Sequence, residues 1–176
     1  MLGGIASGKT TVASLFQEIG AQVINGDDMA GEILNFPHVK DKITKLWGKK
    51  LIIGSCINKK KLAEIAFQSH NNLKKLENII HPVIWKRIQK ELQVLANNGK
   101  HIIVLDIALL WESGLYSACD HLIFVDTPSK IRIQRTIDER GWDSEELIKR
   151  EHYQADLAIK RKAADFIIFN DKSAKR

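Results

Sequence analysis

Short apolar runs alternate along this chain of 176 residues with longer segments whose hydrophobic residues recur at helical spacing. Apolar runs of about four to eight residues are typical of buried strands, and a spacing of about 3.6 residues is typical of helices. Four runs are predicted to be strands, at residues 21–24, 101–106, 122–125 and 164–169. Because strands and helices alternate, we expect an α/β fold with a parallel sheet flanked by helices.

Several helices are predicted around this sheet. The first has one apolar face, formed by Val12, Leu15, Phe16 and Ile19. Gly20 should end it, and Gly141 should end a second helix that starts near residue 128. Asp143 with Glu146 three residues later is typical of a capping box, so a further helix is expected from there to about residue 162.

Residues 29–98 are predicted to be almost entirely helical, with one weak strand signal at residues 51–53. Pro82 is expected to divide the longest apolar-periodic run and to open a second helix, which leaves His81 just before it. This stretch is too long for a simple crossover, so it should form a lobe for a second substrate. We expect three parts: a core (1–30, 99–138 and 163–176), a helical lobe (31–98) and a lid (139–162).

The chain has a net charge of +6, a pI of about 9.3 and two cysteines far apart. A protein that handles polyanionic small molecules explains this charge, and no basic stretch with interleaved aromatics favours nucleic acid. No apolar run approaches the roughly 20 residues of a membrane span. We expect a cytoplasmic protein, a monomer or weak homo-oligomer, without nucleic-acid or membrane partners.

The most specific motif is the run GGIASGKTT near the start of the chain. Gly3, four residues and Gly8-Lys9-Thr10 have the spacing of a Walker A phosphate-binding loop, or P-loop. Backbone N–H groups of such a loop cradle a polyphosphate, the lysine contacts the β- and γ-phosphates, and the hydroxyl can ligate Mg²⁺. The predicted nucleotide-binding residues of the loop are Gly3, Gly4, Ile5, Ala6, Ser7, Gly8, Lys9, Thr10 and Thr11.

This motif makes the expected sheet P-loop NTPase-like, with ATP and Mg²⁺ as cofactors. A P-loop normally follows a central strand, yet only Met1 and Leu2 precede Gly3. We therefore expect the sheet to lack its first strand, as it would if the sequence were clipped.

Three aspartates come at the ends of predicted strands, where ligands of parallel sheets bind. Asp27 is the candidate general base, and the alternative is that it caps the next helix, for which Asp28 is better suited. Asp106 follows four apolar residues as a Walker B aspartate does and could hold Mg²⁺, although a purely structural role is equally open. Asp126 ends the third strand.

Arginines before Gly141 suggest a lid that closes over phosphates. Arg135 and Arg140 could bind phosphate oxygens bidentately, and further cations follow on the next predicted helix. Those cations are Arg150, Lys160 and Arg161. His81 could contact a substrate or simply pack at a helix boundary.

With these residues in place, the chain resembles the dephospho-coenzyme A kinase family over nearly its whole length. The resemblance is carried by the segments GGIASGKTT, VINGDDMA, LENIIHPVI, DIALLWESGLY, IFVDTPSKIRIQRTIDERG and ADFIIFN. It implies transfer of the ATP γ-phosphate to the ribose 3′-hydroxyl of dephospho-coenzyme A, the last step of coenzyme A synthesis.

The resemblance also implies roles for individual residues. Asp27 would be the catalytic base, Lys9 and Arg140 would act on the phosphates, and Asn170 would lie close to the adenine. The implied substrate-binding residues are Asp27, His81, Leu109 and Glu112. Three positions depart from the family pattern, Asn25, Gly31 and Ala108, and the usual C-terminal helix is not seen.

Three other interpretations stay open from the residues alone. Another P-loop kinase of nucleosides or nucleotides would have the same loop and lid. A nucleotide-dependent switch such as a GTPase is disfavoured, because the sequence has no Asn-Lys-x-Asp element. An inactive homologue is suggested by the expected loss of the first strand.

Overall fold

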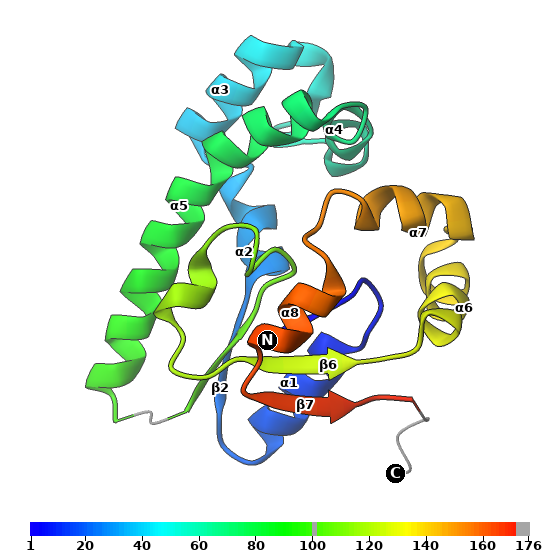
Figure 1. The fold of residues 1–176 in the computed structure, drawn as a ribbon. Coiled ribbons are helices and arrows are strands. Elements are labelled where there is room, and N and C mark those ends of the chain that lie inside the picture. Colours follow the sequence, from blue (N-terminus) through cyan, green and yellow to red (C-terminus); the bar gives the residue numbers. More distant parts are fainter. Residues whose placement is uncertain (100–101, 172–176) are drawn as a thin grey trace. The chain divides into compact units, whose positions relative to one another are not determined.

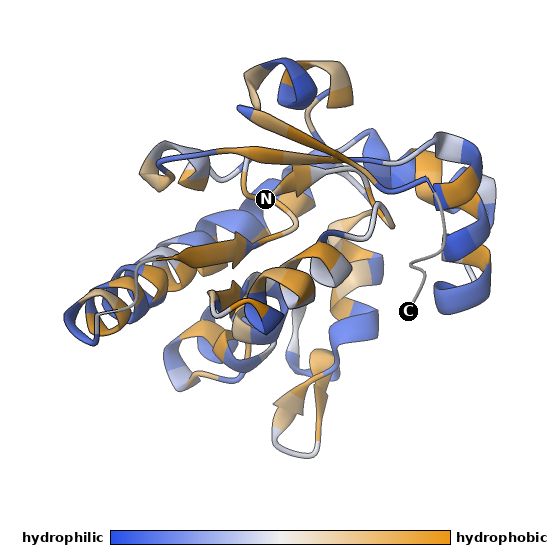
Figure 2. Ribbon diagram, turned by 90° about the horizontal axis from the view of Figure 1, so that it is seen from below, coloured by the Kyte–Doolittle hydropathy of each residue, from blue (hydrophilic) through white to orange (hydrophobic). Residues whose placement is uncertain are grey.

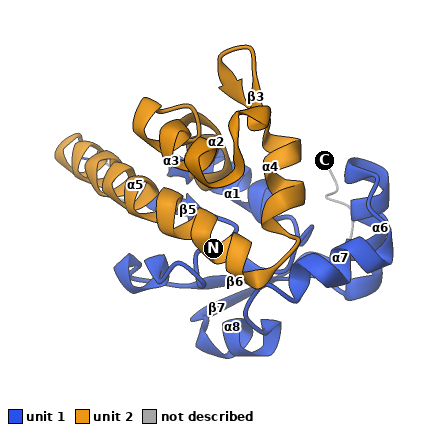
Figure 3. Ribbon diagram, turned by 90° about the horizontal axis from the view of Figure 1, so that it is seen from above, with its two compact units in different colours: residues 1–24, 99–176 blue, residues 25–98 orange. Residues whose placement is uncertain are grey.

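A computed structural model describes residues 1–99 and 102–171. The chain forms two compact units: residues 1–24 with 99–176, and residues 25–98 (Figure 3). The border falls inside the second strand, so that Asp27 belongs to the second unit, whereas the sequence predicted the helical lobe from residue 31. A separate lid stays a prediction.

The first unit is an α/β unit that contains the phosphate loop (Figure 1). Its strands are β1 (Leu2–Gly3), β2 (Gln22–Asn25), β5 (Ile103–Asp106), β6 (Ile123–Asp126) and β7 (Phe166–Phe169). Strands β1, β6 and β7 lie side by side in that order and pair in parallel, and β2 pairs with β5. The predicted α/β fold with a parallel sheet is confirmed, with strand bounds shifted by one or two residues.

The expectation that the first strand is lost is wrong. Strand β1 is only two residues long, but Leu2 and Gly3 are in register with Phe124 and Val125 of β6. The Met1 amino nitrogen donates a hydrogen bond of 2.6 Å to the carbonyl of Leu105 on β5. The few residues before the loop therefore link β5 to β6, which gives the loop a rigid anchor.

The helices of this unit are α1 (Lys9–Glu18), α6 (Ser129–Arg140), α7 (Ser144–Glu151) and α8 (Leu157–Ala163), with a 3₁₀ turn at Leu115–Ala118. Buried Val12 and Ala13 of α1 join an apolar core with Val104 and Val125 of the sheet. Most of the sheet has hydrophobic colours in Figure 2, in agreement with this core.

The expected apolar face of the first helix is only partly correct. Val12 is buried and Phe16 packs against the core, but Leu15 and Ile19 are 51% and 77% exposed. Ala13 is buried in their place, so the buried face of α1 is formed by Val12, Ala13 and Phe16.

A single helix from residue 143 to about residue 162 was also expected, and this is wrong. Asp143 does cap α7, since its side chain accepts a hydrogen bond from the Glu146 N–H at 2.8 Å. The helix stops at Glu151, however, and α8 starts only at Leu157. A side chain from a distant loop breaks it, as described below for Glu112.

The second unit is mainly helical. It consists of α2 (Gly26–Ile33), α3 (Pro37–Trp47), a 3₁₀ turn (Lys49–Leu51), a small antiparallel hairpin of β3 (Ile52–Ile53) and β4 (Cys56–Ile57), α4 (Lys59–Ala66) and α5 (His70–Asn97). Helices α2, α3 and α4 all pack against α5. The weak strand signal at residues 51–53 corresponds to β3.

Pro82 does not divide α5, which is continuous over 28 residues. Proline in a helix interior removes one hydrogen bond and costs about 3 kcal/mol. Leu73 before it and Ile84 and Ile88 after it are nevertheless buried on the same helix. The burial of this shared face against α2, α3 and α4 offsets the cost, and a sequence pattern cannot show such packing.

In the part of the chain that the structure describes, no helix combines the length and the apolar character needed to cross a membrane.

Candidate active site

The carbonyl groups of the phosphate loop are all engaged by hydrogen-bond donors. Lys9 Nζ donates to the carbonyls of Gly3 and Gly4, at 3.1 and 2.9 Å. Arg132 and Arg135 donate to the next two carbonyls, those of Ile5 and Ala6, both at 3.3 Å. Because the carbonyl oxygens already accept hydrogen bonds, the N–H groups dominate the electrostatic potential of the loop. An anion-binding site requires this.

The end of the loop is held from two other strands. Thr127, which follows β6, and Asn170, which follows β7, both donate to the Ser7 carbonyl at 2.8 Å. Gly8 then adopts the left-handed region, with φ 85°, directly before α1 begins at Lys9. The positive N-terminal end of α1 therefore opens into the loop.

Thr10 and Asp106 are brought together from the first turn of α1 and the end of β5. The Thr10 hydroxyl donates to Asp106 Oδ2 at 2.7 Å, and Asp106 is buried. A hydroxyl beside a carboxylate is the kind of oxygen donor set that Mg²⁺ takes, together with water and substrate phosphates. No group of three or more His, Cys, Asp and Glu suited to a metal ion was found among the described residues.

Arg132 is a residue that the sequence reasoning missed as part of the site. It is only 5% exposed and donates both to the Thr127 carbonyl at 3.2 Å and to the loop. Its guanidinium also pairs with Glu151 at the end of α7. The available signal was its position three residues before Arg135, which places both arginines on one face of α6.

Arg140 lies at the last residue of α6 and packs on an aromatic ring. The Arg140 and Arg150 guanidinium carbons lie 5.0 and 4.0 Å from the centre of the Trp142 ring, so both cations contact the same indole. Among the residues that the structure describes, Arg140 makes no hydrogen bond with the loop. The structure thus brings Arg135 to the phosphate loop and leaves Arg140 on Trp142.

Glu112 forms a buried ion pair with Lys160 of α8. Lys160 Nζ lies 2.6 Å from Glu112 Oε1, and the side chains are 1% and 13% exposed. The same oxygen accepts the Ala155 N–H at 2.8 Å, and Lys160 also donates to Gln154 Oε1 at 3.3 Å. In a continuous helix the Ala155 N–H would bond to the Glu151 carbonyl. Glu112 therefore explains the break between α7 and α8.

These contacts change what the predicted lid cations can do. Lys160 is committed to Glu112, and Arg161 Nε lies 3.1 Å from Asp126 Oδ2. Both charges are therefore paired with carboxylates of the same unit. Leu109, another predicted substrate-binding residue, is half-buried in the turn after β5.

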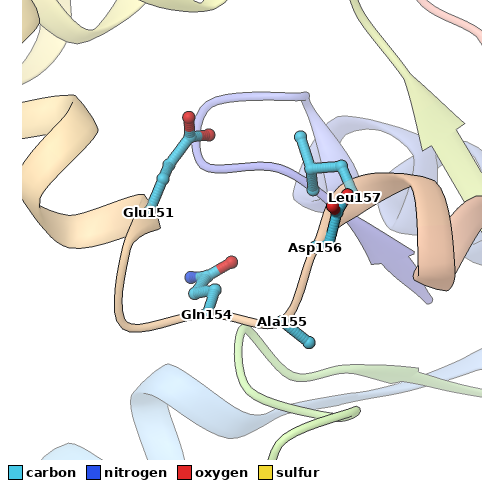
Figure 4. Close-up of a pocket in the computed structure, with 5 residues that line it drawn as sticks. All are labelled: Glu151, Gln154, Ala155, Asp156 and Leu157. Carbon is cyan, nitrogen blue, oxygen red and sulfur yellow. The ribbon is translucent and has the colours of Figure 1, made fainter.

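A pocket of about 260 Å³ lies along the connection between α7 and α8 (Figure 4). It is lined by Glu151, Gln154, Ala155, Asp156 and Leu157. Figure 4 shows the Glu151 carboxylate beside the blue loop, and Arg132 links that carboxylate to the Ile5 carbonyl of the phosphate loop. The pocket thus lies next to the phosphate loop.

Asp27 and His81 belong to the second unit. Asn25 caps α2, because its Oδ1 accepts the Asp27 and Asp28 N–H groups at 2.9 and 3.1 Å. The expectation that Asp28 is the cap is therefore wrong, and both carboxylates project from the first turn of α2. His81 lies inside α5, where burial lowers its pKa and the nearby Glu77 partly opposes this shift.

Comparison with known proteins decides the family. All 176 residues match the family model described as dephospho-CoA kinase. The chain belongs to the dephospho-CoA kinase family. Members of this family are ATP-dependent kinases, in agreement with the phosphate loop.

Individual members of the dephospho-CoA kinase family are similar over nearly their whole length. The dephospho-CoA kinase of Bacillus licheniformis is 35% identical, over 99% of this chain and 88% of its own. That of Carboxydothermus hydrogenoformans is also 35% identical, over 98% and 85%.

Two solved structures show the same fold. A crystal structure from Thermus thermophilus superposes with a TM-score of 0.82 at 28% identity, covering 98% of this chain and 87% of that one. The dephospho-CoA kinase from Campylobacter jejuni gives a TM-score of 0.70 at 31% identity, with the same coverage.

Proposed function

We propose that this chain transfers the γ-phosphate of ATP to the ribose 3′-hydroxyl of 3′-dephospho-CoA, which completes the synthesis of coenzyme A. Membership of the dephospho-CoA kinase family supports the acceptor. The observation that carries the phosphoryl-transfer chemistry is the engagement of the later loop carbonyls by the side chains of Arg132, Arg135, Thr127 and Asn170.

The loop binds the triphosphate through its N–H groups and Lys9. The Lys9 ammonium already lies at the start of the loop, held by the neutral carbonyls of Gly3 and Gly4. Phosphate oxygens carry negative charge and are stronger acceptors than carbonyls, so the ammonium exchanges these contacts for the β- and γ-phosphates. Arg135, with Arg140 from the end of α6, offsets the charge that develops on the transferred group.

Thr10 and Asp106 are the residues that would hold Mg²⁺. A Mg²⁺ ion held by them would supply positive charge to offset that of the β- and γ-phosphates. The Asp106 carboxylate accepts a hydrogen bond from the Thr10 hydroxyl, which orients the oxygen lone pairs of Thr10.

Asp27 orients the 3′-hydroxyl of the acceptor and accepts its proton. Phosphoryl transfer passes through a loose transition state, so this proton moves late. Asn25 fixes the backbone of Asp27 in the first turn of α2. His81, Leu109 and Glu112 are proposed to contribute to binding of the acceptor, Glu112 through the segment that it holds at Ala155.

An acceptor panel tests the proposal. ATP consumption is measured with dephospho-CoA and with a set of nucleosides and nucleotides, and the product is examined by phosphorus NMR for a new 3′-phosphate. We expect a clear preference for dephospho-CoA. Equal or faster turnover of any nucleoside or nucleotide would favour another P-loop kinase and reject the proposed acceptor.

Asp27→Asn tests the base within the same assay. The rate should fall by about 10²–10⁴-fold with ATP binding nearly unchanged. Asp28→Asn is the matched control, because both residues lie in the first turn of α2 and both N–H groups bond to Asn25. A loss of tenfold or less in Asp27→Asn would reduce Asp27 to a residue that only positions the substrate.

We further propose that the enzyme works in the cytoplasm as a monomer or a weak homo-oligomer. Sedimentation of the purified chain over a range of concentrations measures its oligomeric state directly, and a stable dimer at all concentrations would contradict this expectation.

A further inference from the structure

Gly31 lies in α2, and an ammonium group occupies the space that a side chain there would need. A Cβ atom at this position would collide with Lys59 Nζ and lie 3.2 Å from Lys59 Cε. Gly31 is buried, and Lys59 is the first residue of α4. Both residues belong to the second unit (Figure 3), so their contact is internal to it.

The contact places the Lys59 ammonium over the face of α2 that carries Asp27. Asp27 and Gly31 are four residues apart, which puts them on one face of the helix, about 5–6 Å from each other. None of the ion pairs found in the described ranges 1–99 and 102–171 includes Lys59. A cation without a carboxylate partner therefore lies one helical turn from the proposed base.

We propose that Lys59 binds the diphosphate of dephospho-CoA and so helps to select this acceptor. The inference rests on the proposed function. The 3′-hydroxyl and the 5′-diphosphate of the acceptor are substituents of one ribose. A cation that binds the diphosphate therefore has to lie about the length of one ribose from the proposed catalytic base Asp27. One turn of α2 provides that separation. An ammonium binds phosphate oxygens as a compact point charge.

Gly31 has a specific part in this arrangement. The absence of a side chain leaves room for the lysine end directly on the helix backbone. Gly31→Ala adds one methyl group where the ammonium now lies, and only the flexible end of Lys59 has to move. Alanine also favours the helix, so the variant should fold.

Steady-state kinetics with dephospho-CoA test the inference. Loss of one charged hydrogen bond to phosphate corresponds to about a tenfold rise in the KM for dephospho-CoA in Lys59→Gln. The KM for ATP should not change. Lys61→Gln removes the same charge from the same helix at a position about 200° away around its axis, and its KM should stay within about twofold of wild type.

Gly31→Ala should raise the KM for dephospho-CoA in the same direction. In the double variant Gly31→Ala/Lys59→Gln the effects should not add, because both changes remove one interaction. Fully additive effects would mean that Gly31 acts independently of Lys59 and would overturn the assignment.

Adenosine tests whether Lys59 acts on the diphosphate, because it has the same ribose as the acceptor but no phosphates. Its inhibition constant against dephospho-CoA should be equal in wild type and Lys59→Gln. An equal loss for adenosine, or an unchanged KM for dephospho-CoA in Lys59→Gln, would overturn the inference while the proposed function stands. A wild-type chain that does not phosphorylate dephospho-CoA would overturn both.

Discussion

The Thr10 hydroxyl donates to the Asp106 carboxylate across 2.7 Å, which ties the first turn of α1 to the end of β5. The two residues were predicted separately, one from the Walker A spacing and the other from four apolar residues before a carboxylate. Because the Thr10 hydroxyl directs its hydrogen to Asp106, only its oxygen lone pairs are left for the Mg²⁺ proposed to bind there.

Asp106→Asn should weaken the binding of Mg²⁺ without unfolding the protein. The amide has the same shape and its oxygen can still accept from Thr10, but the charge is lost. We expect about a 10–100-fold rise in the Mg²⁺ concentration that gives half-maximal rate. Titration of the rate with Mg²⁺ measures it, with thermal unfolding as the control for folding. An unchanged Mg²⁺ requirement would leave Asp106 a structural residue.

Gly8→Ala should abolish ATP binding. Gly8 has φ 85°, and an added Cβ would collide with Asn170 Nδ2, which holds the Ser7 carbonyl. The variant therefore combines backbone strain with displacement of a side chain that shapes the loop. Gly20→Ala is the matched control, because φ is 99° there and no atom lies within 4 Å of the added Cβ.

Equilibrium binding of an ATP analogue and chemical unfolding separate the two effects. Both variants should lose about 1 kcal/mol of stability or more, since both place alanine at positive φ. Only Gly8→Ala should lose nucleotide binding. Normal ATP affinity in Gly8→Ala would remove the phosphate loop from the mechanism.

Much of the first unit could be predicted from the sequence, because local patterns determine it. A buried strand is a short apolar run, and the loop spacing 3-8-9-10 needs no tertiary information. The two-residue strand β1 could not be predicted, since it pairs with β6 and the preceding Met1 bonds to β5, both more than 100 residues away in sequence.

The failures share a physical cause in contacts between distant segments. The continuity of α5 at Pro82 comes from packing against three other helices. The break before α8 comes from Glu112, which takes the Ala155 N–H, and the role of Arg132 comes from carbonyls of the phosphate loop. Spacing in the sequence can place Arg132 on the same face of α6 as Arg135, but it does not identify the distant partners in these contacts.

Removing only one partner of the Glu112–Lys160 ion pair should strongly destabilise the folded protein. Glu112→Gln leaves a buried ammonium without its counter-charge, which should cost about 3–5 kcal/mol in the free energy of unfolding. Lys160→Met should cost a similar amount. The double variant Glu112→Gln/Lys160→Met should be markedly more stable than either single variant.

Urea unfolding of the four proteins measures this coupling. The kinetics of the same variants tell whether Glu112 also binds the acceptor. Additive losses in the double variant would contradict the buried pair as the cause, since two independent groups would then be responsible.

Acid should destabilise the protein partly through His81. Burial lowers the pKa of His81 in the folded state below its ordinary value of 6.5, so the unfolded chain binds the proton more readily. Stability is therefore complete above about pH 6.5 and falls as the pH drops toward the lowered folded-state pKa. Urea midpoints between about pH 7.5 and about pH 5 measure this slope.

His81→Gln should reduce the acid-dependent loss of stability. His121→Gln is the control, since the His121 side chain is 70% exposed. An identical pH slope in wild type and His81→Gln would show that other groups cause the acid sensitivity.

Trp142 should position Arg140 and Arg150 through its ring. The Arg140 and Arg150 guanidinium groups lie against the same indole. A cation–π contact near the surface is worth about 0.5–1 kcal/mol, so Trp142→Leu should lower kcat about two- to fivefold at unchanged KM for dephospho-CoA. Trp142→Phe keeps an aromatic face and should recover most of the rate. Equal kcat values for the leucine and phenylalanine variants would show that the ring contributes only volume, and Arg140 would then be positioned by its place in α6 alone.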